Sequence, residues 1–257
     1  MITKENLSIA SLLEVLDSNL HRGRDDIAIF EIGKGYGYDE TAAVINEWWR
    51  LGFVLVGASE APAWDRQPRA WDVDDAKGIV ELIAGRLRSG RVSWSALSES
   101  AVFHPGRSAT GTIEGQLEGR VGELHPGLVA DLDLRAERIV IGEIAIRGLA
   151  GGSLAAARVV PIARFPEVER DLSIVIGADR PAGDVERTVR TSGGELLRGV
   201  RLFDIYRGAP LAAGERSLSY RLTLQAEDRT LTDAEIEAIL ASITTALARD
   251  VGGRIRT

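Results

Sequence analysis

The sequence contains no cysteine, which excludes disulfide bonds, thiolate metal ligands and cysteine nucleophiles. It also lacks an apolar run of about 18 residues, the length that a membrane-spanning helix needs. Residues 1–5 do not have the basic-then-apolar layout of a secretory signal. From these absences we expect a cytoplasmic protein with no membrane partner.

Lysine is scarce, since it occurs only at positions 4, 34 and 77, and the net charge is −7. Residues 1–158 carry 17 basic and 23 acidic side chains, whereas residues 159–257 carry 14 and 15. Neither part is a polycation, so any contact with RNA must be local. Arginine, the dominant cation, suits planar stacking and forked hydrogen bonds, although genome base composition explains its use equally well.

Motifs for catalysis are missing too. The sequence has no Gly-x-Ser-x-Gly elbow and no glycine-rich phosphate loop with a lysine. Residues 33–37 are rich in glycine and follow a predicted strand, but Tyr38 stands where a dinucleotide loop needs glycine. We interpret this stretch as an ordinary loop.

The few histidines leave two interpretations open. His104 and His125 each precede a proline, and a metal site that they form with Glu123 is conceivable. We favour side chains that hold tight X-Pro turns by hydrogen bonds, and we expect His21 to cap a helix. We therefore predict neither catalytic residues nor a metal site.

Hydrophobic periodicity divides the chain in two. The Gly/Ala-rich stretch 148–157 is the best linker, so we predict domains over 1–158 and 159–257. The first domain should contain several strands and few helices, which is typical of an antiparallel sheet. Its expected helices cover residues 8–22, 41–51 and 72–87, and its expected strands cover 27–32, 53–57, 92–97, 112–117, 120–124 and 138–147.

The second domain reads as β-α-β-β-α-β, the order of a ferredoxin-like plait. A strand at 171–176 precedes a helix that ends at Gly193-Gly194. After a hairpin, Thr232 and Glu235 predict a capping box for a long helix that Gly252-Gly253 ends. A short last strand follows. The fold class is α+β, and one face of the second sheet should be free of helices.

The hairpin of this plait is the most informative stretch. Alternation sets Phe203 and Ile205 on one face and places on the other face a polar group: Asp204, Tyr206, Ser217, Ser219 and Arg221. Closing the hairpin puts Tyr206 opposite Ser217. An exposed tyrosine can stack a nucleobase, and the acid and hydroxyls can read its edge. The alternative is an ordinary polar face whose tyrosine packs against a neighbouring domain.

Motifs in order along the whole chain resemble the bacterial phenylalanyl-tRNA synthetase β subunit family. They are Phe30-Glu31-Ile32-Gly33, Asp75-Ala76-Lys77-Gly78-Ile79-Val80-Glu81, Phe103-His104-Pro105-Gly106-Arg107-Ser108-Ala109, Val121-Gly122-Glu123-Leu124-His125-Pro126, Arg164-Phe165-Pro166, Leu202-Phe203-Asp204-Ile205-Tyr206-Arg207-Gly208, Arg216-Ser217-Leu218-Ser219-Tyr220-Arg221-Leu222 and Arg229-Thr230-Leu231-Thr232-Asp233.

The resemblance implies that residues 1–158 are an inactive, class II synthetase-like domain and that residues 159–257 bind the anticodon of tRNA-Phe. It implies that Tyr206 stacks on the first anticodon base, a guanine, while Asp204 and Ser217 meet its edge. Ser219 and Arg221 complete the expected tRNA-binding set. Family members are about three times longer and pair with an α subunit, and the holoenzyme uses ATP and magnesium. Here Phe30-Glu31 lacks the arginine of an ATP site, so we expect no cofactor in this chain. The alternative function is a protein-interaction or regulatory module that uses the helix-free face for a subunit or small ligand.

Overall fold

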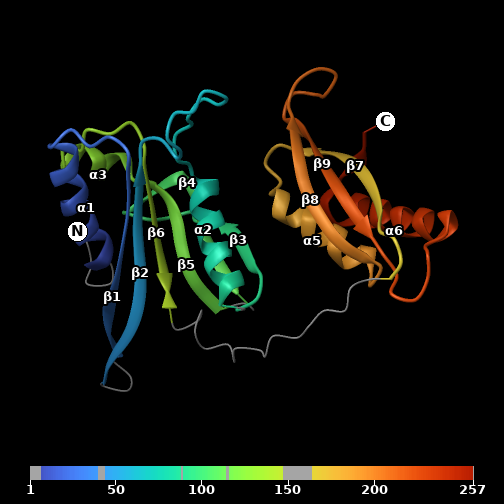
Figure 1. Cartoon of the computed structure of the whole chain (residues 1–257), viewed down its shortest axis with the longest axis horizontal. Coiled ribbons are helices and arrows are strands. Elements are labelled where there is room, and N and C mark those ends of the chain that lie inside the picture. Colours follow the sequence, from blue (N-terminus) through green and yellow to red (C-terminus); the bar gives the residue numbers. More distant parts are fainter. Residues whose placement is uncertain (1–6, 40–43, 88, 114–115, 147–163, 257) are drawn as a thin grey trace. The chain divides into compact units, whose positions relative to one another are not determined.

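The computed structural model divides the chain into two compact units, residues 1–158 and 159–257 (Figure 1). It describes residues 7–39, 44–87, 89–113, 116–146 and 164–256. The predicted linker over 148–157 and the boundary near residue 158 lie outside these residues.

The first unit is a six-stranded antiparallel sheet in the order β1-β2-β6-β5-β4-β3 (Figure 1). Its elements are α1 (Leu7–Leu20), β1 (Ile27–Asp39), β2 (Val44–Val56), α2 (Val73–Arg86), β3 (Val92–Ala96), β4 (Phe103–Ile113), β5 (Gln116–Leu124), α3 (Pro126–Asp131) and β6 (Ile139–Ala145). The antiparallel sheet that the sequence predicts is confirmed.

Both faces of the central strands are buried, because a helix packs on each face. On β2, Val54 and Val56 join a core that includes α1, whereas Phe53 and Leu55 join a core that includes α2. Successive side chains of β2 thus enter the two cores in turn, because they point to opposite faces of the sheet. This explains why residues 53–56 read as a continuous apolar run.

The hairpin of β1 and β2 corrects two expectations. The expected loop over 33–37 continues β1, and the described part of the expected helix over 41–51 is β2. Gly35 pairs with Trp48, and a Cβ at Gly35 would lie 2.7 Å from the Trp48 indole nitrogen. The glycine thus leaves room for the indole, and aromatic side chains favour strands over helices.

Two smaller corrections concern strand ends. The expected strand over 112–117 spans two strands, because β4 ends at Ile113 and β5 begins at Gln116. The β4 strand also begins earlier than the sequence suggests, at Phe103, and its pairing with β5 contains two register shifts. Burial does not alternate over the first residues of β4, between Phe103 and Ser108, so a sequence pattern does not show this part of the strand.

A braced loop over residues 58–70 connects β2 to α2. An Ala58–Ala70 bridge closes its base, and Arg69 binds Asp75 through two contacts of 2.6 Å. These contacts hold the pKa of Asp75 below its usual value. Trp64, at the loop's far end, is 98% exposed.

The second unit confirms the predicted plait. Its elements are β7 (Val168–Gly177), α5 (Ala182–Gly193), β8 (Leu197–Tyr206), β9 (Glu215–Leu224), α6 (Asp233–Val251) and β10 (Arg254–Ile255), and the sheet order is β10-β7-β9-β8. Both helices cover one face, over a core formed by Ile174, Val185, Leu218, Tyr220, Leu222, Ile243 and Leu247. Among the described residues, no helix lies on the opposite face, which we call the helix-free face (Figure 1).

Local signals position the two helices as predicted. Thr232 and Glu235 form the capping box of α6, and Gly252 ends that helix in the left-handed conformation. Gly194 ends α5 with a φ of 65°. Among the helices of the described residues, none is long and apolar enough to cross a membrane.

Candidate nucleic-acid interface

The five predicted site residues lie together on the β8–β9 hairpin. Strand pairing sets Tyr206 opposite Ser217, as predicted, and Asp204 opposite Ser219. Arg221 lies two residues further along β9. Strand β9 runs between β8 and β7, so the residues of β7 that flank the same rows are Val175, Ser173 and Asp171.

A β-bulge places Phe203 differently from the prediction. The register shifts between Leu202 and Asp204, so that an extra residue stands in β8. The Arg221 guanidinium lies 5.5 Å from the Phe203 ring centroid, and Phe203 is exposed. Ile205 is exposed as well. The predicted alternation is therefore wrong for Phe203, which the bulge places on the same face as Arg221. It is right for Ile205, which pairs with the buried Leu218 and is exposed because β8 is an edge strand.

The two serines form a floor below the surface. Ser217 is 0% exposed and Ser219 is 6% exposed, which corrects the expectation that the sheet presents their hydroxyls to solvent. The Ser219 Oγ lies 2.9 Å from the Oγ of Ser173 in a hydrogen bond. The Ser217 Oγ has no hydrogen-bond partner among the described residues.

Arg221 is paired rather than free. Its guanidinium donates two hydrogen bonds to the Asp171 carboxylate, at 2.8 and 2.9 Å. This bidentate contact holds the pKa of Asp171 below its usual value. With Phe203 beneath it, Arg221 presents a fixed planar surface.

Tyr206 and Asp204 are the side chains of the site that lie nearest to solvent, beside the two buried serines. The Tyr206 hydroxyl donates to the backbone carbonyl of Ala209 at 2.5 Å, which anchors the ring. The Arg256 guanidinium lies 4.7 Å from the ring centroid. Asp204 is exposed, with no ion-pair or hydrogen-bond partner in the described part of the chain. Sequence reasoning missed Arg256, because only the sheet order brings the end of β10 to the hairpin.

The histidines have the structural roles that we favoured. His104 and His125 each accept a hydrogen bond at Nδ1 from the backbone N–H two residues on, at 3.0 Å. His21 contacts the backbone carbonyl of Asp17 at the end of α1. Glu123 pairs with two arginines rather than with histidine. The described residues contain no group of three or more acidic or histidine side chains that could hold a metal.

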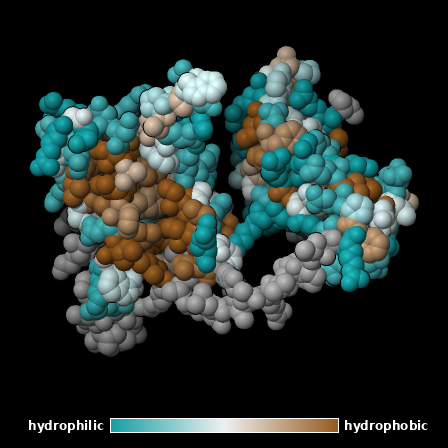
Figure 2. Space-filling view, viewed as in Figure 1, coloured by the Kyte–Doolittle hydropathy of each residue, from teal (hydrophilic) through white to brown (hydrophobic). Residues whose placement is uncertain are grey.

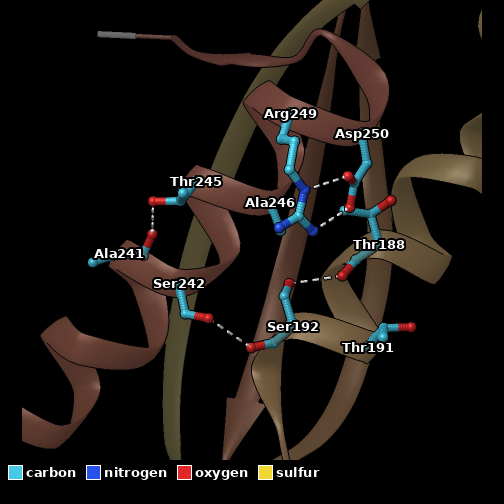
Figure 3. Close-up of a pocket in the computed structure, with 9 residues that line it drawn as sticks. All are labelled: Thr188, Thr191, Ser192, Ala241, Ser242, Thr245, Ala246, Arg249 and Asp250. Carbon is cyan, nitrogen blue, oxygen red and sulfur yellow. Dashed lines mark hydrogen bonds and ion pairs between the residues drawn. The ribbon is translucent and has the colours of Figure 1, made fainter.

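A hollow of about 580 Å³ lies between α5 and α6 (Figure 3). Five hydroxyl-bearing residues line it, and four of the hydroxyls donate to backbone carbonyls, as that of Ser242 does to Ser192 and that of Thr245 does to Ala241. Its arginine, Arg249, binds the adjacent Asp250. Because these donors are already engaged, we assign no ligand to this hollow.

The first unit carries an exposed apolar face on β1 and β2. Phe30 is 71% exposed, and Ile32 and Trp49 are more than half exposed. The register puts Phe30 beside Phe53 and Ile32 beside Leu51, on the face whose other half α2 covers. Figure 2 shows hydrophobic side chains gathered over this part of the unit.

Comparisons with known proteins cover both units. Residues 6–146 match the family described as phenylalanyl tRNA synthetase beta chain CLM domain, and residues 163–256 match the ferredoxin-fold anticodon binding domain. The phenylalanine–tRNA ligase beta subunit of Moorella thermoacetica is 38% identical over 96% of this chain, and that of Symbiobacterium thermophilum is 34% identical over 99%. The chain spans 30% and 28% of those two proteins. A pyrrolysyl tRNA synthetase structure from Desulfitobacterium hafniense aligns with 55% of this chain and 46% of its own at 17% identity and a TM-score of 0.41.

Proposed function

This chain belongs to the phenylalanyl-tRNA synthetase beta-chain family, and on that premise we propose that it serves phenylalanine–tRNA ligase as a non-catalytic part. In this proposal the second unit binds the anticodon of tRNA-Phe and the first unit docks the α subunit, in the cytoplasm. The observation that carries the proposal is the gathering of Tyr206, Asp204 and Ser217 at one end of the β8–β9 hairpin.

The hairpin chemistry supports recognition of one unpaired base. The Tyr206 ring offers a stacking surface for it. The exposed Asp204 carboxylate can accept hydrogen bonds from the amino and ring N–H groups of a guanine, which adenine does not present in the same pattern. Ser217, Ser219 and Arg221 supply the floor and one wall.

The anticodon part is tested by titrating the chain with a tRNA-Phe anticodon stem-loop. Replacing Tyr206 with Ala should weaken binding by about 1–3 kcal/mol, because the stacking surface is lost. Tyr206→Phe is the matched control, since it keeps the ring and removes only the bond to Ala209. Equal affinities for wild-type and Tyr206→Ala protein would refute the anticodon assignment and favour the protein-interaction alternative.

The exposed apolar face supports a protein partner for the first unit. Contiguous apolar side chains of this kind mark interaction surfaces. Replacing Phe30 with Asp should reduce co-purification with a co-expressed α subunit by more than about tenfold, because the complex would bury an unpaired charge. Val15→Asp on α1 is the control, because Val15 is also exposed but lies on a helix that covers the other face.

We assign ATP and magnesium to the α subunit. Glu31 follows Phe30, where the resemblance places the arginine of an ATP site. Glu31 accepts a hydrogen bond from Ser11, and its negative charge would repel a phosphate. This chain alone should therefore not aminoacylate tRNA-Phe, and turnover in a charging assay with the chain alone would contradict the assignment.

A further inference from the structure

The helix-free face of the second unit contains a spot that is buried although no helix covers it. Val175 on β7 is 1% exposed and its partner Ser217 on β9 is 0% exposed. These two residues occupy the two central strands of the sheet. Something other than a helix must shield them from solvent.

Long side chains on this face lie beside that spot. Arg254 pairs with Val175 in the sheet and reaches Glu215 on β9 at 2.7 Å, and Arg256 meets Tyr206. Tyr206 belongs to β8 and Arg256 follows β10, and these strands form opposite edges of the sheet, about 14 Å apart at ordinary strand spacing. Their side chains nevertheless meet at 4.7 Å. They therefore extend toward one another across β7 and β9, from Ser173, beside which Arg256 lies, to Ser217, which Tyr206 faces.

Each side of this bridge is anchored at its base. The Arg256 backbone N–H donates to the Ser173 carbonyl at 2.8 Å, and the Tyr206 hydroxyl holds the Ala209 carbonyl. The Arg256 guanidinium itself forms no ion pair within the described part of the chain, so its contact with the ring is its main constraint. Beneath it the Ser217 hydroxyl is buried without a partner among the described residues.

We propose that Arg256 occupies, in the RNA-free chain, the position on Tyr206 that the nucleobase takes, so that base binding exchanges one stacked plane for another. The inference rests on the proposed function of this hairpin and names an unpaired purine as the incoming group. A guanidinium is a flat cation that stacks on aromatic faces as a base does. When it leaves, the Ser217 hydroxyl becomes accessible and acquires its first hydrogen-bond partner.

The experiment compares the affinity of the full chain for the anticodon stem-loop among four proteins. Arg256→Lys keeps the charge but loses the planar group, and Arg256→Ala loses both. We expect both variants to bind about two- to fivefold more tightly than wild type, because no stacked guanidinium plane has to leave the Tyr206 ring first. Arg254→Ala is the charge-matched control; Arg254 pairs with Glu215 at 2.7 Å, and its loss should not strengthen binding.

A second readout needs no RNA. The Arg256 Nε–H proton should resonate upfield in the NMR spectrum of the free chain, because it lies over the Tyr206 ring, and Tyr206→Leu should abolish that shift. A missing shift, or weaker binding by both Arg256 variants, would overturn the exchange while leaving anticodon binding intact. If the stem-loop does not bind wild type at all, the proposed function fails, and the exchange falls with it even where the NMR shift is present.

Discussion

Ser217 and Ser219 lie two residues apart on β9, yet the structure gives their hydroxyls different surroundings. The Ser219 hydroxyl has a partner in Ser173, so Ser219→Ala should lower the free energy of unfolding by about 0.5–1.5 kcal/mol. The Ser217 hydroxyl is buried without a described partner, so Ser217→Ala should leave stability unchanged or raise it, while weakening binding of the stem-loop. Urea denaturation and RNA titration of both variants measure the two effects.

The opposite pattern would count against a role for Ser217 in binding. A Ser217→Ala protein that unfolds more readily and binds RNA normally would mean that its hydroxyl is structural. At this scale the sequence predicts which residues share a row, since Tyr206 does face Ser217. The sequence does not predict that Ser217 is buried on the helix-free face, because its burial depends on side chains from the far edge of the sheet, such as Arg256.

Among the elements, β6 pairs with β2, and the Phe53 ring on β2 lies over the position of Gly142 on β6. A Cβ at Gly142 would lie 2.1 Å from the Phe53 ring. Gly142→Ala should therefore destabilise the first unit by about 1–3 kcal/mol through overpacking. Gly78→Ala in α2 is the control, because nothing lies within 4 Å of its Cβ position, and it should stabilise the helix by about 0.5–1 kcal/mol. Thermal denaturation should show a lower melting temperature for Gly142→Ala and a higher one for Gly78→Ala than for wild type.

The capping box of α6 makes the second unit sensitive to acid. Hydrogen bonds from the Thr232 backbone, together with Arg229, lower the pKa of Glu235 from 4.5 to about 2. Because the folded pKa is the lower one, this contribution to stability is complete above about pH 4.5 and is lost as the pH falls towards 2. The stability difference between wild type and Glu235→Gln, measured by urea denaturation from pH 2 to 6, should shrink over that interval. A stability difference that stays constant over this pH range would contradict a stabilising role for the ionised Glu235.

The elements that the sequence predicts well are those with local signals. Thr232 with Glu235 begins α6, and Gly252 ends it, because caps act on the chain next to them. The β1–β2 hairpin was predicted wrongly for the converse reason. Trp48 takes its place by packing on Gly35 of the neighbouring strand, and no spacing within residues 41–51 contains that contact.

For the whole molecule, each hydrophobic core is complete within one unit. All five tryptophans belong to the first unit, at positions 48, 49, 64, 71 and 94, so intrinsic fluorescence follows that unit while circular dichroism follows both. We expect the two signals to change at different urea concentrations. Gly142→Ala should shift the fluorescence midpoint and leave the remaining circular-dichroism transition in place; coincident, equally shifted midpoints would contradict this.

The candidate site is formed by residues from both ends of the second unit. Asp204, Tyr206 and Ser217 are close in sequence, and the hairpin pattern brings them together. Arg256 lies at the other end of the unit, and it reaches Tyr206 only because the plait places β10 and β8 at the two edges of one sheet. Topology, rather than any motif, sets this contact.

Strand β1 has a consequence for how the chain behaves when it is produced without a partner. It is a 13-residue edge strand, and no described strand pairs with its outer side. Its unpaired N–H and C=O groups, beside the exposed Phe30 and Ile32, form a template onto which another chain can add as a further strand. The purified chain should thus become turbid as its concentration rises, with co-expression of the docking subunit keeping it dispersed.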